Sequence, residues 1–156
     1  MGAVTLSFRH LVIPVLAATV ACGGGSPSAG VVPAPADPET SVSQFLTAAS
    51  AGDLEAMARL WGDERGPSSS TNVIPREERT RRLTIMQRLL RSDSFQITGT
   101  NALDPAKPVV TAAISQGTRR YSVPFTVVRW QTHGWLVKEI DLTPAMPAAG
   151  PRTPSN

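Results

Sequence analysis

The hydrophobic residues of this chain follow two different periods. Between residues 40 and 91 they recur every three or four positions, and the first such set is Val42, Phe45, Leu46 and Ala49. This spacing stacks them on one face of a helix. From residue 92 onward the period is two, with Phe95 and Ile97 facing one way and polar neighbours facing the other, which is typical of a half-buried strand. The pattern therefore predicts helices first and strands afterwards.

Three helices are predicted. The first has its N-cap at Thr40 or Ser41 and ends at Gly52. Asp53 then offers a new N-cap, because its carboxylate can accept the free amide hydrogens of the following turn. The apolar residues of the second helix are Leu54, Met57, Leu60 and Trp61.

The third helix is predicted over residues 76–91, after a polar loop over residues 62–72. Pro75 suits the start of a helix, because the N–H that proline lacks would have no partner in the first turn. The apolar face of this helix holds Leu83, Met86, Leu89 and Leu90.

Four strands are predicted in segments rich in β-branched and aromatic residues, over residues 95–98, 109–115, 119–130 and 134–142. Because short turns separate them, they should pair as an antiparallel meander. Pro124 has no N–H for a ladder bond, which predicts a sheet edge or a bulge there. The expected fold class is α+β, with the helices packed on one face of a curved antiparallel sheet of about four strands.

Residues 1–21 have the layout of a secretory signal. Arg9 and His10 precede an apolar run over residues 11–21 that ends in small residues, and such a segment is removed from the mature protein. The run is too short to cross a membrane, which takes roughly 20 apolar residues. The sequence thus predicts an exported protein.

The end of this run, Thr19-Val20-Ala21-Cys22, resembles the bacterial lipobox, in which a small residue precedes a cysteine that receives a diacylglyceryl thioether. The resemblance implies that Cys22 is lipidated and anchors the protein to a membrane of the cell envelope, on the periplasmic face or at the cell surface. Thr19 departs from the usual aliphatic residue, and ordinary signal cleavage would leave Cys22 as a plain thiol. Lipidation also explains why an exported chain has a single cysteine and so no disulfide partner for it.

Composition divides the rest of the chain. Glycine, proline, serine and alanine dominate residues 22–39, and prolines recur through residues 144–156. Neither segment has enough apolar surface to form a core, so both are predicted to be disordered, the first as a linker behind the lipid anchor. Residues 40–143 remain as one domain of ordinary size.

The order of elements in this domain resembles a known family. The similarity rests on the helix with Phe45, the junction Ala51-Gly52-Asp53-Leu54-Glu55-Ala56-Met57, the arginine-rich third helix and the closing strand Gly134-Trp135-Leu136-Val137-Lys138-Glu139-Ile140. These features are similar to the nuclear transport factor 2-like, or cystatin-like, cone fold. The fold hosts isomerases, dehydratases, polyketide cyclases, transport factors and structural modules, so it assigns no activity by itself.

The resemblance implies that an enzyme of this kind would use an Asp, His or Tyr inside the cone. Asp53 is interpreted as a helix cap and His133 as a turn residue. The alternation of Tyr121 with apolar residues favours core packing with a hydrogen-bonded hydroxyl. Alternation alone leaves open whether Glu139 faces inward, where burial would raise its pKa. The candidate pocket residues are Trp61, Tyr121, Phe125, Trp135 and Glu139.

The sequence lacks the residue patterns typical of metal binding, phosphate binding and nucleic-acid binding. No set of His, Cys, Asp and Glu has metal-ligand spacing and no glycine-rich loop joins a strand to a helix, so no metal or other cofactor is expected. The formal net charge is +3, or about +2 without Arg9, which is too small for nucleic-acid binding. Six arginines on the third helix are interpreted as a solvated face with ion pairs from Glu77 and Glu78 to Arg81 and Arg82. Contact with anionic headgroups is the alternative.

These inferences predict an envelope lipoprotein without catalytic activity, whose domain binds a partner protein or an apolar ligand or has a structural role. The alternative is a small enzyme of the isomerase or cyclase kind that uses a buried carboxylate in the cone. A buried ionisable group inside the cone would separate the two.

Overall fold

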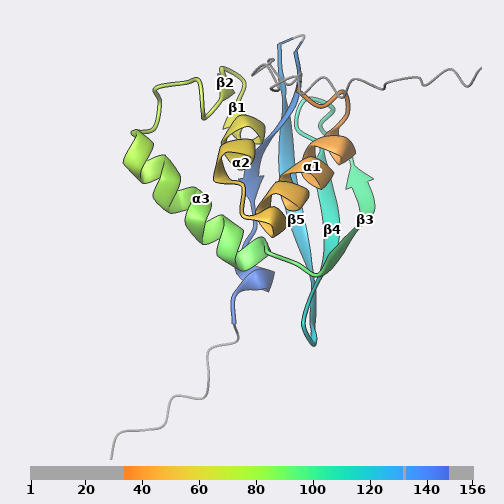
Figure 1. The fold of residues 1–156 in the computed structure, drawn as a ribbon. Coiled ribbons are helices and arrows are strands. Elements are labelled where there is room, and N and C mark those ends of the chain that lie inside the picture. The colour runs from red at the N-terminus through yellow and green to blue at the C-terminus, as the bar shows by residue number, and fades with distance from the viewer. Residues whose placement is uncertain (1–33, 132, 148–156) are drawn as a thin grey trace, which may run out of the picture. The chain divides into compact units, whose positions relative to one another are not determined.

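The structure is a computed structural model that describes residues 34–131 and 133–147. In these residues three helices precede a four-stranded antiparallel sheet, and the sheet is open (Figure 1). The expected α+β class, with helices on one face of an antiparallel sheet, is confirmed. The predicted signal, Cys22 and most of both predicted disordered segments lie outside the described residues.

The sheet follows the order of the chain, β3-β4-β5-β6. Its strands are β3 (Ser94–Asn101), β4 (Val109–Gln116), β5 (Arg119–Trp130) and β6 (Gly134–Ile140). All neighbouring pairs are antiparallel, which confirms the predicted meander. β3 and β6 are therefore the two edges of the sheet.

Pro124 lies in β5, a central strand, and not at the predicted edge or bulge. It is paired with Thr111 of β4, and its carbonyl accepts the N–H of Asp141 at 3.1 Å, just past the last residue of β6. In an antiparallel ladder the N–H and C=O of one residue point to the same neighbouring strand. The side of Pro124 that lacks an N–H therefore faces the residues just past the end of β6. Proline is tolerated at this position because no ladder bond between β5 and β6 is lost.

α1 (Pro38–Ala51) begins two residues before the predicted start of the domain. Asp37 is its N-cap: one carboxylate oxygen accepts the Thr40 N–H at 2.8 Å, and the other accepts the Thr40 hydroxyl at 2.7 Å. Pro38 follows at the first helical position, where its fixed φ suits a helix. The predicted N-cap at Thr40 or Ser41 is wrong. Gly52 ends the helix with a φ of 74°, as expected.

We expect Asp37→Ala to lower the free energy of unfolding by about 1 kcal/mol at neutral pH, the usual loss for an N-cap. The hydrogen bonds from Thr40 hold the pKa of Asp37 below its ordinary value of 3.8. The ionised carboxylate therefore stabilises the fold above that value, and this contribution is lost as the pH falls through the lower pKa of the folded protein. Urea denaturation of both proteins from neutral pH to well below pH 3.8 measures the difference. A difference that stays constant over this range would contradict the prediction.

α2 (Leu54–Leu60) and α3 (Arg76–Leu90) match the two other predicted helices to within one residue at either end. Asp53 caps α2 by accepting the Ala56 N–H at 2.8 Å, as predicted. Pro75 directly precedes α3, and Leu83 and Leu90 on its inward side are buried.

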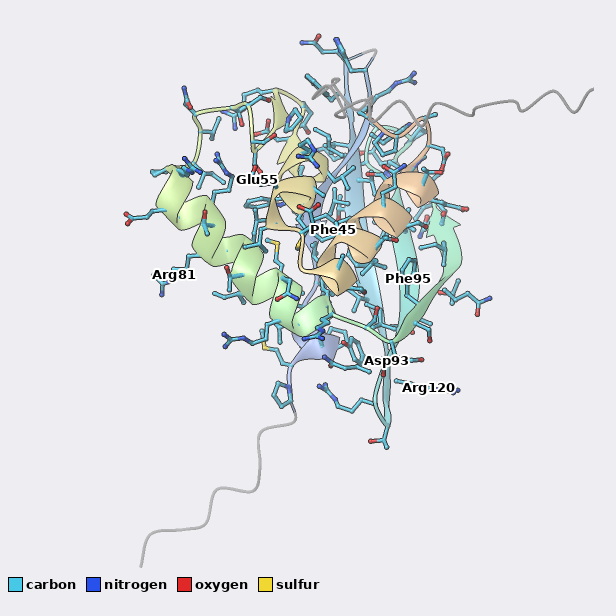
Figure 2. The ribbon with its side chains drawn as sticks, viewed as in Figure 1. Phe45, Glu55, Arg81, Asp93, Phe95 and Arg120 are labelled. Atoms are coloured by element: carbon cyan, nitrogen blue, oxygen red, sulfur yellow. The ribbon has the colours of Figure 1, made fainter. Side chains whose placement is uncertain are left out.

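Most arginines of α3 are solvated, and Arg81 projects away from the sheet in Figure 2. The exposed ones are Arg76, Arg81, Arg82 and Arg88. Ion pairs were predicted from Glu77 and Glu78 to Arg81 and Arg82, and the structure forms the pair Glu78–Arg82. Arg79 is half-buried and donates to the Ser68 carbonyl at 2.6 Å, so it ties α3 to the loop before it.

The predicted polar loop over residues 62–72 contains a small hairpin of β1 (Gly62–Asp63) and β2 (Gly66–Pro67). Trp61, just before the hairpin, forms a parallel bridge with Val137 of β6. The hairpin therefore begins beside the edge of β6. Periodicity does not reveal it, because glycine and proline are poor strand formers.

The core lies between the helices and the inner face of the sheet, meaning the face toward α1. α1 contributes Val42, Phe45 and Leu46, and the central strands contribute Val110, Ala112, Ile114, Val123, Phe125 and Val127. All of these side chains are at most 1% exposed. Phe45 on α1 and Phe95 on β3, both labelled in Figure 2, take part in this packing.

Residues on both sides of the predicted domain pack against it. The Pro35 carbonyl accepts the Trp135 N–H at 2.9 Å. A Cβ on Gly134 would lie 2.5 Å from that carbonyl, so glycine permits this close approach. After β6, the 3-10 helix η1 (Thr143–Ala145) ends in Ala145, which is buried and whose carbonyl accepts a bond from Arg119 at 3.1 Å. The packed region thus extends beyond residues 40–143.

Candidate functional site

The pairing of β5 with β6 decides which face Glu139 occupies. Val127 is opposite Val137, whereas Thr126 is opposite Glu139, so Lys138 is the extra residue of a β-bulge. Directly opposed residues share a face. Val137 therefore lies on the inner face with Val127, and Glu139 lies on the outer face with Thr126. Glu139 is exposed, so it is not a carboxylate inside the helix-covered side of the sheet.

A hollow of about 210 Å³ lies beside this bulge, at the edge of β6. The apolar residues that line it are Trp61, Val73 and Ile74, and the polar ones are Asp63, Ser68, Thr71, Lys138 and Glu139. It is called the β6 pocket below. Its walls come from the end of α2, the hairpin, the segment before α3 and β6, so it depends on the fold rather than on one motif.

Hydrogen bonds hold the walls of the β6 pocket in place. The indole N–H of Trp61 donates to the Lys138 carbonyl at 3.2 Å, and the hydroxyl of Ser68 donates to the Ala58 carbonyl at 3.0 Å. The Lys138 ammonium reaches across to the Glu64 carboxylate, with N–O distances of 2.8 and 3.1 Å. The bulge therefore supplies both a backbone acceptor for the indole and a cation for the hairpin.

Two pairs of ionised groups lie around the pocket, Glu64 with Lys138 and Asp63 with Arg65. Lys138 lowers the pKa of Glu64 mainly through its hydrogen bond, and the same bond raises the pKa of Lys138. Arg65 lowers the pKa of Asp63 in the same way. All three shifts favour the charged forms, so these groups remain ionised at neutral pH. None of them has the pKa of a general acid or base that works near pH 7.

The structure brings together two of the five candidate pocket residues. Trp61 and Glu139 line the β6 pocket. Phe125 is completely buried in the core. The Tyr121 hydroxyl donates to the Leu89 carbonyl at 2.8 Å, and burial raises the pKa of this tyrosine. Trp135 lies under the guanidinium of Arg129, 5.8 Å from its ring centre.

The other titratable candidates have structural roles. Asp53 is a helix cap. His133 is exposed in the turn between β5 and β6 and stacks on Trp130 with 4.6 Å between ring centres. Within residues 34–131 and 133–147, no three His, Cys, Asp or Glu side chains are grouped so that they could hold a metal ion.

Of the residues that line the β6 pocket, sequence reasoning named Trp61 and Glu139 and missed the others, among them Val73, Ile74 and Lys138. One signal was present, because Val73 and Ile74 form an apolar pair inside an otherwise polar loop directly before Pro75. Val73 remains 49% exposed in the folded chain. Lys138 carried no such signal, since its place depends on the bulge.

Comparison of the chain with models of protein families, with curated proteins and with solved structures found no match. Of the helices in the described residues, none has both the length and the apolar character that a membrane span requires.

Proposed function

We propose that this chain is a lipoprotein of the bacterial envelope, anchored through Cys22, whose domain is a non-catalytic module that binds a partner protein. The β6 pocket is the observation that carries this proposal. The lipobox-like Thr19-Val20-Ala21-Cys22 and the glycine-rich segment behind it support the anchor. We further propose a nuclear transport factor 2-like domain, which the order of three helices followed by an antiparallel meander supports.

The size of the β6 pocket favours a side chain of a partner protein over a free apolar ligand. Pockets that enclose drug-sized ligands measure roughly 300–1,000 Å³, whereas this one measures about 210 Å³. The indole of Trp61 and the aliphatic side chains of Val73 and Ile74 could enclose one apolar side chain of a partner. The charged groups at the rim of the pocket could form polar contacts with the partner residues around that side chain. An apolar anchor with a polar rim is the usual anatomy of a protein interface.

The inner face of the sheet supports a module without catalytic activity. Among the described residues, the buried polar side chains are Ser41 and Ser68. Both hydroxyls donate to backbone carbonyls, that of Ser41 to Trp135 at 3.1 Å and that of Ser68 to Ala58. The alternative enzyme would need a carboxylate on this face, and Glu139 lies on the opposite one.

A photoreactive phenylalanine analogue placed at Val73 in the full chain, in living bacteria, tests the binding role. We expect irradiation to yield one major covalent adduct with another protein, because Val73 lines the β6 pocket and is half exposed. The matched control places the analogue at Leu103, which is 92% exposed and lies outside the pocket. Equal adducts from both positions, or none from Val73, would contradict a partner at the β6 pocket.

A further inference from the structure

The two edge strands of the sheet, β6 and β3, differ in how much of the rest of the chain contacts them. β6 is covered along its outer side by Trp61, which bridges to Val137, and by Pro35, which accepts the Trp135 N–H. β3 forms the other edge (Figure 1). Within residues 34–131 and 133–147, the backbone of β3 bonds only to β4. Among the described residues, the outward N–H and C=O groups of β3 therefore have no backbone partner, and such a row is a template for another strand.

From this edge we infer that two copies of the chain pair through β3, joining their sheets across a two-fold axis. The sequence of β3, Ser94–Asn101, contains no charged residue and no proline. Lysine, inward-pointing charge and proline are devices that stop edge strands from pairing, and a β-bulge is another. The bulge of β3 comes after Ile97 and leaves the first half of the strand regular. An uncharged strand can lie against its own copy without placing like charges opposite each other. This absence of repulsion favours a second copy as the occupant.

The bulge in β3 limits the paired stretch. The register with β4 shifts between Ile97 and Gly99, and the Thr98 hydroxyl donates to the Thr111 carbonyl at 3.2 Å. A bulge bends its strand and increases the local twist. Thr98 is the extra residue of this bulge, so pairing between copies is confined to the regular part, Ser94–Ile97.

Side-chain direction and the chemistry of the opposed pairs together select one register. In an antiparallel pair, opposed residues point to the same face. The residue at the two-fold axis must therefore lie opposite its own copy, because an axis between two neighbouring residues would oppose side chains of different faces. With Gln96 on the axis, Phe95 of each copy lies opposite Ile97 of the other, on the inner face. Both are half-buried at this edge and pack against the core. The register thus forms two aromatic–β-branched pairs, a favourable cross-strand combination.

The helix above this edge leaves room for the second copy. Two contacts show which side of α1 lies toward β3. The Glu39 carboxylate accepts the Thr100 hydroxyl at 2.7 Å, and the Ser50 hydroxyl lies 3.0 Å from that of Ser92. Ser43 is four residues after Glu39 and seven before Ser50, so it shares this side. Apart from Glu39 near the start of the helix, this side of α1 carries the small uncharged side chains of Ser43 and Ser50, which would let the helices of two copies approach one another.

Sedimentation equilibrium of the purified full chain in detergent tests this pairing with two matched variants. Gln96→Lys places two ammonium groups opposite each other on the axis, and Gln44→Lys adds the same charge at an exposed position of α1. We expect wild type to be dimeric. Gln96→Lys should raise the dissociation constant at least about tenfold, which corresponds to roughly 1.4 kcal/mol, whereas Gln44→Lys should leave it within about twofold. A monomeric wild type, or equal effects of the two variants, would overturn the inference.

Disulfide cross-linking provides a second readout that does not depend on a charge. In Gln96→Cys the two new thiols would face each other across the axis, where opposed Cβ atoms lie about 4.5–5.5 Å apart, close enough to be oxidised to a disulfide after a small adjustment. We expect a much stronger dimer band from Gln96→Cys than from wild type or Gln44→Cys, which measure any background from Cys22. An adduct of Gln96→Cys with a different protein would assign the edge to another partner and overturn self-pairing. The adduct expected from Val73 is unaffected by Gln96→Lys, so the two proposals can fail separately.

Discussion

Replacing Phe125 by alanine is expected to lower the free energy of unfolding by about 3–5 kcal/mol, the usual cost of truncating a buried aromatic ring. Phe125 is completely buried and is among the largest side chains of the core. It lies in the central strand β5, opposite Val110 of β4 and Ile140 of β6. Neighbours on both sides are held by ladder bonds, so they cannot move inward to fill the space.

The loss is large because domains of this size are stable by only roughly 5–15 kcal/mol in total. Urea denaturation of the wild type and of Phe125→Ala measures it. The matched control is Leu103→Ala, since Leu103 is 92% exposed and its truncation should change stability by less than about 0.5 kcal/mol. Equal effects of the two substitutions would show that Phe125 does not belong to a packed core.

Replacing Cys22 by alanine is expected to abolish acylation of the chain. The expectation rests on the proposed lipobox and on the fact that Cys22 is the only cysteine. Each buried CH₂ group of an acyl chain contributes about 0.8 kcal/mol, so two or more chains hold a protein on a membrane almost permanently. Growth of bacteria with a fatty-acid analogue, followed by detection of the label on the purified protein, measures the change.

The control for this experiment is Ser26→Ala, which alters the same segment but leaves the cysteine in place. It should carry as much label as the wild type. If wild type and Cys22→Ala carry equal label, or if neither carries any, the chain is not a lipoprotein. Cell fractionation adds to this readout but cannot replace it, because an uncleaved signal could itself keep the Cys22→Ala variant on a membrane.

The regular elements could be predicted from the sequence because their signals are local. A period of three to four residues gave the helices, alternation gave the strands, and Gly52 with Asp53 marked the junction between α1 and α2. The start of α1 was missed for a local reason as well. The proline-rich composition before residue 40 predicted disorder, yet in Asp37-Pro38 the same residue types form a helix cap.

The candidate site was harder to predict because it depends on register between strands far apart in the sequence. Periodicity placed Glu139 in phase with Trp135 and Val137, but the bulge at Lys138 moves it to the other face. No local signal in the last strand reveals that bulge. The β6 pocket likewise combines Trp61, Ile74 and Lys138, which only the folded chain brings together.

The bond between Pro35 and Trp135 also has a mechanical consequence. Within the described residues, a pull on the chain from its N-terminal side reaches this backbone hydrogen bond before it reaches the cap of α1. Breaking it would free residues 34–36, whose fully extended span is at most about 10 Å at about 3.3–3.6 Å per residue, so the connection would lengthen by less than that. The ladder between β5 and β6 would stay intact. We therefore expect this segment to detach under load before the sheet is disturbed.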